Sequence, residues 1–252
     1  MKNLINKKII RVLPIVFILF WTGCEDLNFP DPNNPTDDTA TIQSLVTGSE
    51  AGLRSGFGVY MRDLLVIGRE AYYLEPADPR YTGELLTGPI DPGGFLCYTP
   101  WAANYKVVKN CLTILNSNDV DNGAKGFAQT LQAYCLMRVL NLTDTNGARL
   151  NYDGDINVDV ATKAEVLAEI ESLLDAGLNN LQSAESSFSF TLSSGFDGFN
   201  TPATFAHFNR GLRARIAVLQ DDWSAAQTAL TSCADWMNSS DDDMGVYHVF
   251  SS

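Results

Sequence analysis

Apolar residues recur every three to four positions through most of the chain, the spacing that gathers them on one face of an α-helix. The pattern predicts helices over 39–60, 101–118, 123–142, 162–183, 201–219 and 223–237. Strand-like patterns occur in two short stretches, 188–192 and 246–250. The sequence therefore predicts an all-α fold with long irregular loops.

Two of the predicted helices carry clear start signals. Thr162-Lys-Ala-Glu165 fits a capping box, in which the threonine oxygen and the glutamate satisfy free backbone amides at the helix start. Thr201-Pro202 is typical of an N-cap followed by a proline in the first turn. Both starts are expected to be sharp.

Small residues indicate where helices approach one another. Gly48, Gly52 and Gly56 recur at every fourth position, which predicts a face where another helix packs closely. In 206–237, alanines stand where two antiparallel helices would meet, and Trp223 follows a short turn. This pair resembles one tetratricopeptide-type unit, but the irregular spacing between helix pairs does not show regular repeats.

The first 38 residues read as an export signal followed by a tether. Four basic residues precede an apolar run over 12–21, which is typical of a secretory signal and too short to span a bilayer. Cys24 directly follows the small pair Thr22-Gly23, so we expect cleavage after residue 23 and lipid attachment to Cys24. The prolines and asparagines of 24–38 predict an extended tether.

The charge of the chain limits its partners. The formal charge is −13, and removal of the four basic residues in the signal brings it to −17. Such a surface repels phosphate backbones and anionic lipid headgroups. Nucleic acid is therefore not an expected partner, and we expect acyl chains to hold the protein on a membrane.

The remaining cysteines and the histidines give no metal signature. Cys97, Cys111, Cys135 and Cys233 lack paired spacing, so either disulfides or free core thiols are open for them. The two histidines stand outside any zinc motif. The acidic stretch 151–159 does not fit a calcium-binding loop, because Val158 and Ala164 occupy its glycine and glutamate positions. No metal and no cofactor are expected.

Several short motifs resemble the SusD/RagB family of surface lipoproteins. The tether reads Cys24-Glu-Asp-Leu and then Asp31-Pro-Asn-Asn-Pro-Thr36, and the predicted helix over 101–118 carries Trp101, Tyr105 and Asn110. Further matches are Ala124-Lys-Gly-Phe127, the alanine-rich stretch 212–226 and the segment 247–252. The family's Leu-Tyr-Gly-Asp-x-Pro motif is replaced by 140–147, so that loop is expected to be rebuilt.

The resemblance implies a function and a location. Such proteins are non-catalytic: they capture oligosaccharides or peptides at the surface of the outer membrane and deliver them to a TonB-dependent, SusC-like transporter. Family members are considerably longer, so 39–252 is expected to correspond to their N-terminal helical domain, with the C-terminal part missing.

Candidate ligand-binding residues lie in the region rich in proline, glycine and tyrosine. Residues 68–100 predict a long ordered loop, and such loops are often functional. Because aromatic planes can stack on sugar rings, the candidates are Arg80, Tyr81, Tyr98, Trp101 and Asn104. Trp101 and Tyr105 lie one helical turn apart, so packing in the core is an open alternative for them.

Two other classes of function are weighed against ligand capture. A helical-repeat scaffold that binds only protein would share the helix pairs but would not need the aromatic residues. A surface glycosidase would need paired carboxylates such as Glu70 with Glu75 or Asp221 with Asp222, which an acidic chain offers by chance. No nucleophile elbow, zinc-binding helix motif or phosphate-binding loop occurs, so an enzyme is not expected.

Overall fold

The fold is that of a computed structural model, which describes residues 40–75, 77–118, 120–152, 154–155, 157–234 and 243–250. The chain divides into two units, Met1–Ala40 and Thr41–Ser252, and the helices belong to the second. The predicted signal, Cys24 and the tether lie outside the described residues.

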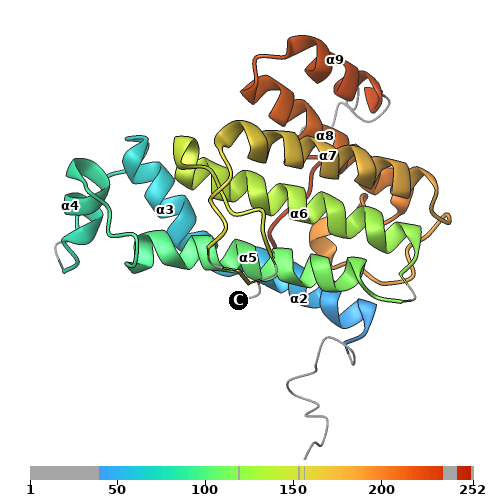
Figure 1. The fold of residues 1–252 in the computed structure, drawn as a ribbon, viewed down its shortest axis with the longest axis horizontal. Helices are drawn as coiled ribbons and strands as arrows, with labels where there is room; N and C mark the ends of the chain where they lie inside the picture. Colours follow the sequence, from blue (N-terminus) through green and yellow to red (C-terminus); the bar gives the residue numbers. More distant parts are fainter. Residues whose placement is uncertain are drawn as a thin grey trace, which may run out of the picture. The chain divides into compact units, whose positions relative to one another are not determined.

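The described part of the chain is all-α, as the apolar pattern predicts (Figure 1). Its only β pairing is a single bridge between Ala148 and Ala161. The α-helices are α2 (Ile42–Arg54), α3 (Phe57–Ile67), α4 (Arg80–Thr87), α5 (Phe95–Leu115), α6 (Asn122–Thr143), α7 (Lys163–Gln182), α8 (Pro202–Leu219) and α9 (Trp223–Thr231). Two short 3-10 helices, η1 (Asp144–Asn146) and η2 (Ser194–Phe196), lie between them.

The strand-like prediction for 188–192 and 246–250 is wrong. The amide of Thr191 donates to the side chain of Gln43, and the amide of Tyr247 donates to the carbonyl of Gly195. The Gln43 side chain also donates to the Thr191 carbonyl, so Thr191 pairs with a side chain and Tyr247 makes one bond to a 3-10 helix. Neither described segment joins a β-ladder.

Helix α6 is the centre of the fold (Figure 1). It packs against α5 on one side and α7 on the other, while α2 covers α5, α8 covers α7 and α9 covers α8. Its apolar side chains point in all directions and are buried, which is the pattern of a helix enclosed by its neighbours. Phe127, Leu131 and Leu136 are fully buried and connect the two largest core clusters.

The predicted helix over 39–60 is two helices. α2 ends at Arg54, and α3 begins at Phe57 after Gly56, whose φ of +66° is left-handed. A right-handed helix cannot continue through such a residue, so the chain changes direction there. The predicted close-packing face is confirmed, because a Cβ on Gly52 would lie 2.6 Å from Val107 of α5.

The predicted loop over 68–100 is interrupted by structure. α4 forms within it and buries Tyr81 and Leu85, and α5 begins at Phe95 rather than at 101. Pro100 lies inside α5, where its missing amide leaves one turn without a backbone donor. Because prolines and glycines are frequent in 68–100, the sequence did not predict α4 or the first six residues of α5.

The α8–α9 pair begins where the sequence predicts. Thr201 caps α8, Pro202 follows it, and α9 starts at Trp223 after the turn at Asp221 and Asp222. The predicted small contacts are present, since Ala214, Ala217, Ala226 and Ala229 are buried. The tetratricopeptide-type likeness of this pair stays a prediction.

The four described cysteines are free thiols. Cys111 and Cys135 are fully buried in the core, where burial raises the pKa of both thiols, that of Cys135 to about 12. They serve as small apolar core residues. Among the described helices, none has the length and apolar character needed to cross a bilayer.

Replacing Thr162 by alanine should cost about 1 kcal/mol of stability. The structure confirms the capping box: the backbone amide of Thr162 donates to Glu165 Oε2 at 2.8 Å, and the Glu165 amide donates to Thr162 Oγ1 at 3.4 Å. Urea unfolding measures the loss. The control is Thr228→Ala in the exposed interior of α9, where alanine is the better helix former and no loss is expected. Equal losses in both variants would contradict the capping role.

Candidate functional site

Four aromatic side chains form a line along one face of α5, called here the aromatic stripe: Phe95, Tyr98, Trp101 and Tyr105. Their spacing of three, three and four residues makes each ring a neighbour of the next, in a row that slants around the helix by about 120° between Phe95 and Trp101. Ten residues of helix span about 15 Å. Tyr98 is 58% exposed, while the other three rings are half-buried.

The first end of the stripe is held by α4. The guanidinium of Arg80 lies over the Phe95 ring, 4.4 Å from its centroid, and pairs with both carboxylate oxygens of Asp78 at 2.9 and 2.8 Å. Tyr81 turns inward, packing edge-on against Phe95 with its hydroxyl bonded to Arg62. The structure thus places Arg80 beside the stripe and Tyr81 beneath it.

The second end of the stripe is fixed by the loop that follows η1. The Tyr105 hydroxyl donates to the carbonyl of Arg149 at 2.9 Å and accepts from the Arg149 amide at 2.8 Å. Trp101 leans on Tyr105 with ring centroids 4.5 Å apart. Burial raises the pKa of Tyr105, which keeps its hydroxyl protonated and able to donate. Both half-buried rings are therefore held in fixed positions.

Asn104 does not belong to this surface. Its side chain is 2% exposed, and its amide donates to the carbonyl of Pro100 at 2.7 Å. Position 104 faces the interior because it lies one residue before Tyr105, a rotation of about 100° around the helix. Asn104 is a structural residue of α5 in this structure.

Of the residues singled out from the sequence, the structure brings Arg80, Tyr98 and Trp101 to one surface. Sequence reasoning missed Phe95 as a member, because 95 was assigned to a loop. The spacing of aromatic residues at 95, 98, 101 and 105 was the signal that could have placed it on the same helix face.

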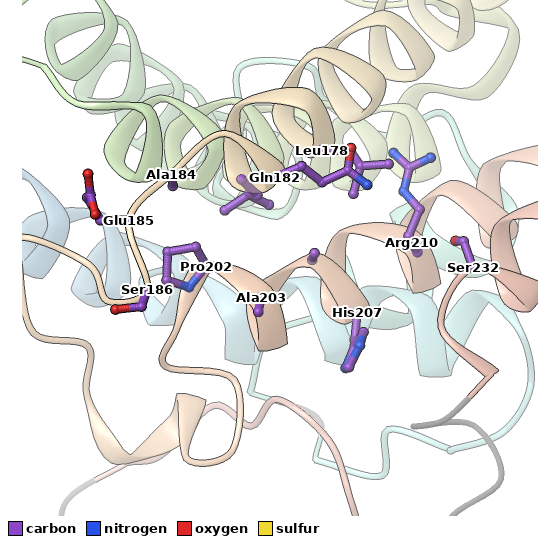
Figure 2. Close-up of a pocket in the computed structure, with 12 residues that line it drawn as sticks. Leu178, Gln182, Ala184, Glu185, Ser186, Pro202, Ala203, His207, Arg210 and Ser232 are labelled. Carbon is purple, nitrogen blue, oxygen red and sulfur yellow. The ribbon is translucent and has the colours of Figure 1, made fainter.

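A second candidate surface is a groove around the segment 183–189, lined by both polar and apolar side chains. It consists of two adjoining hollows of about 390 and 500 Å³ that share Ala184 and Glu185. In Figure 2 the end of α7, with Gln182, lies on one side of the first hollow, and the start of α8, with Pro202 and Ala203, lies on the other. Segments far apart in sequence build this groove, so no local motif indicated it.

Two charged side chains of the groove, Arg210 and Asp121, already make hydrogen bonds within the protein. Arg210 donates to Asn209 Oδ1 at 2.8 Å, to Asp175 Oδ1 at 3.0 Å and to the carbonyl of Leu174 at 2.8 Å. Asp121 accepts the Ala124 amide as the N-cap of α6. Glu185 and Ser186 are exposed on the connecting segment. The groove can offer hydroxyls, an amide and one carboxylate to a polar ligand, but it lacks the row of rings found on α5.

No protein-family model matches this chain, and no curated protein matches it either.

Proposed function

We propose that this protein is a surface lipoprotein that captures oligosaccharides, or peptides, and passes them to a TonB-dependent transporter in the outer membrane. The observation that carries the proposal is the aromatic stripe on α5. It presents an exposed ring at Tyr98, a half-buried ring at Trp101 and the cation of Arg80 at one end.

The chemistry of the stripe suits an elongated sugar ligand. Aromatic rings bury a large apolar area with few rotatable bonds, so a sugar face can stack on them at a small entropic cost. Binding sites of this kind combine apolar contact with a few placed polar groups. Here the fixed positions of Trp101 and Tyr105 mean that little ordering is needed when a ligand binds.

The membrane anchor in this proposal rests on the N-terminal motif. Lipid on Cys24 would hold the protein at a membrane while the tether of 24–38 gives the helical unit reach. The transporter partner and the cell-surface location are what the SusD/RagB resemblance implies.

A protein-binding scaffold is the second candidate function, and one observation favours it. Val218, Leu219 and Trp223 are exposed together at the turn between α8 and α9. Exposed apolar residues that gather in one place often mark a protein contact. This alternative predicts that truncating the aromatic stripe leaves partner binding intact.

The test is a binding screen of the purified full chain against oligosaccharides and short peptides, with product analysis of the same samples. Tyr98→Ala and Trp101→Ala should each weaken binding about tenfold, because truncating an aromatic anchor typically costs 1 to 2 kcal/mol. Tyr72→Ala is the matched control, since this side chain is 73% exposed but lies off the stripe.

Each outcome of the screen has a distinct meaning. Binding that the stripe variants weaken, without turnover, supports capture. Turnover of the ligand would favour a surface glycosidase, and the groove with Glu185 would then be the first place to examine. Ligand binding that survives both stripe variants would overturn the assignment of the site, whereas binding of proteins alone would favour the scaffold.

A further inference from the structure

A small cavity of about 220 Å³ lies away from both surfaces described above. Its walls come from α2, α6, η2, α8 and the segment 246–248. The apolar part includes Leu53, Phe196 and Phe208, and the polar part includes Glu50, Arg54, Tyr134 and His248. It shares no residue with the aromatic stripe.

The cavity lies beside a buried cation. Arg138 donates from Nη1 to the carbonyl of Leu53 at 3.0 Å, and its guanidinium lies 5.7 Å from the centroid of the Tyr134 ring. Leu53 and Tyr134 both line the cavity, so Arg138 lies behind its wall and is not itself a lining residue. The Tyr60 and Phe57 rings, which do not line the cavity, lie 4.8 and 5.1 Å from the same guanidinium. The Nε of Arg138 is buried and has no hydrogen-bond partner within the protein.

Positive charge is in excess around this cavity. In the described part of the chain, no ion pair involves Arg54 or Arg138. The opposing carboxylate is that of Glu50, whose Oε1 accepts the amide and the hydroxyl of Ser193, both at 2.9 Å. His248 lies 3.4 Å from the Tyr134 hydroxyl, and burial together with both guanidiniums lowers its pKa, which favours the neutral ring.

We propose that this cavity binds a small monocarboxylate with a ring-shaped body. Arg54 in the wall and Arg138 behind it oppose the single carboxylate of Glu50, which leaves one positive charge close to the cavity, and such a charge is stabilised by an opposite partner. A guanidinium is well suited to a carboxylate, and the Tyr134 hydroxyl and His248 can add hydrogen bonds. Glu50 disfavours a dianion such as a phosphate monoester.

The size and the apolar wall define the body of this ligand. A volume of about 220 Å³ is below the usual range for sites that hold drug-sized molecules, so a single ring with a carboxylate is the expected occupant. Phe196 and Phe208 offer ring faces to that body. Both an aromatic acid and a uronic acid have this chemistry.

Calorimetry on the purified full chain distinguishes an aromatic acid from a uronic acid and tests whether the ligand needs a carboxylate. The probes are phenylacetate and glucuronate, with phenylacetamide and glucose as neutral counterparts of similar shape. At least one carboxylate should bind ten times or more tightly than its neutral counterpart. Arg54→Gln, at a half-buried position on α2, should weaken that binding about tenfold, because a hydrogen bond to a charged group is lost.

Two further variants make the test sharper. Glu50→Gln keeps the side-chain shape and removes the opposing charge, so carboxylate binding should become several times tighter. Arg69→Gln, at an exposed position outside the cavity, should change nothing. The proposal is overturned if neither carboxylate binds to the folded chain, if the neutral counterparts bind equally well, or if Arg54→Gln binds like the unaltered protein. None of these results bears on the aromatic stripe, whose variants are measured separately.

Discussion

Replacing Gly147 by alanine is expected to destabilise the fold by about 3 kcal/mol, the sum of backbone strain and a steric collision. Gly147 has a φ of +71°, where an L-residue is strained, and an added Cβ would lie 1.8 Å from the carbonyl oxygen of Ala161. That carbonyl accepts the Ala148 amide at 3.1 Å in the bridge that joins the two ends of the loop. The backbone would therefore have to separate at this point.

Two other glycines separate the contributions of strain and collision. Gly154 has a φ of +90° but open space around its Cβ position, so Gly154→Ala should cost only about 1 kcal/mol. Gly211 lies inside α8 with open space as well, so Gly211→Ala should stabilise the fold by about 0.5 to 1 kcal/mol. Urea unfolding of the three variants ranks their free energies of unfolding. A Gly147→Ala loss no larger than that of Gly154→Ala would remove the collision from the explanation.

The Gly147 variant also connects the fold to the proposed function. Arg149, two residues later, holds Tyr105 at the end of the aromatic stripe through its amide and carbonyl. Displacement of this segment should free Tyr105 and, through it, Trp101. If the stripe binds a ligand, Gly147→Ala should therefore weaken binding under conditions where the protein is still folded.

Local signals in the sequence predicted local structure well. The capping box at Thr162 and the Thr201-Pro202 start need only neighbouring residues to act, and both are confirmed. The helix over 123–142 is confirmed as well, although its apolar residues lie on all sides and not on one face. The all-α fold class follows from the same signals. The close-packing face of α2 was also predicted from the sequence, because glycines at every fourth position leave room for a neighbouring helix.

The failures occurred where the outcome depends on distant contacts. Residues 55 and 56 interrupt a good helical pattern, and only the φ of Gly56 shows that the chain turns. α4 is short, and burial of Tyr81 and Leu85 stabilises it more than its own sequence does. The stretches at 188–192 and 246–250 have strand-like composition, but neither finds a neighbouring strand to pair with.

The candidate site was predicted only in part, because some of its features depend on local spacing and others on distant contacts. Tyr98 and Trp101 were singled out for their chemistry, and helical spacing places them together on α5. Asn104 was chosen from the same region, but the rotation of about 100° between it and Tyr105 turns it toward the core, which the predicted helix over 101–118 already implied. The start of that helix was misjudged by six residues, at 101 instead of 95, and Phe95 was missed for that reason. The groove and the cavity could not be predicted, because each is built from segments that meet only in the folded chain.

Asp63 should make the protein less stable as the pH rises from about 4 to 7. Its carboxyl is 3% exposed on α3, and Oδ1 has no hydrogen-bond partner within the protein. Burial raises its pKa from 3.8 to about 7, and the neighbouring Arg62 opposes this only in part. Between these values the folded state holds a proton that the unfolded state releases, so stability falls with pH and stays low above 7.

Asp63→Asn should remove this dependence and stabilise the protein by about 2 kcal/mol at pH 8. The full shift corresponds to roughly 4 kcal/mol, but a buried amide without a partner retains part of the cost. At pH 4 the folded carboxyl is protonated and the unfolded one is only partly ionised, so little of the burial cost is felt and the variant should gain little. The measurement is urea unfolding of both proteins at pH 4 and pH 8, with Asp159→Asn in the exposed loop as a control for the change in net charge. If Asp159→Asn raises the free energy of unfolding at pH 8 by the same amount, the gain comes from the change in net charge. A gain in Asp63→Asn alone identifies an ionised carboxylate that is held within the packing of α3 against α4 and α5.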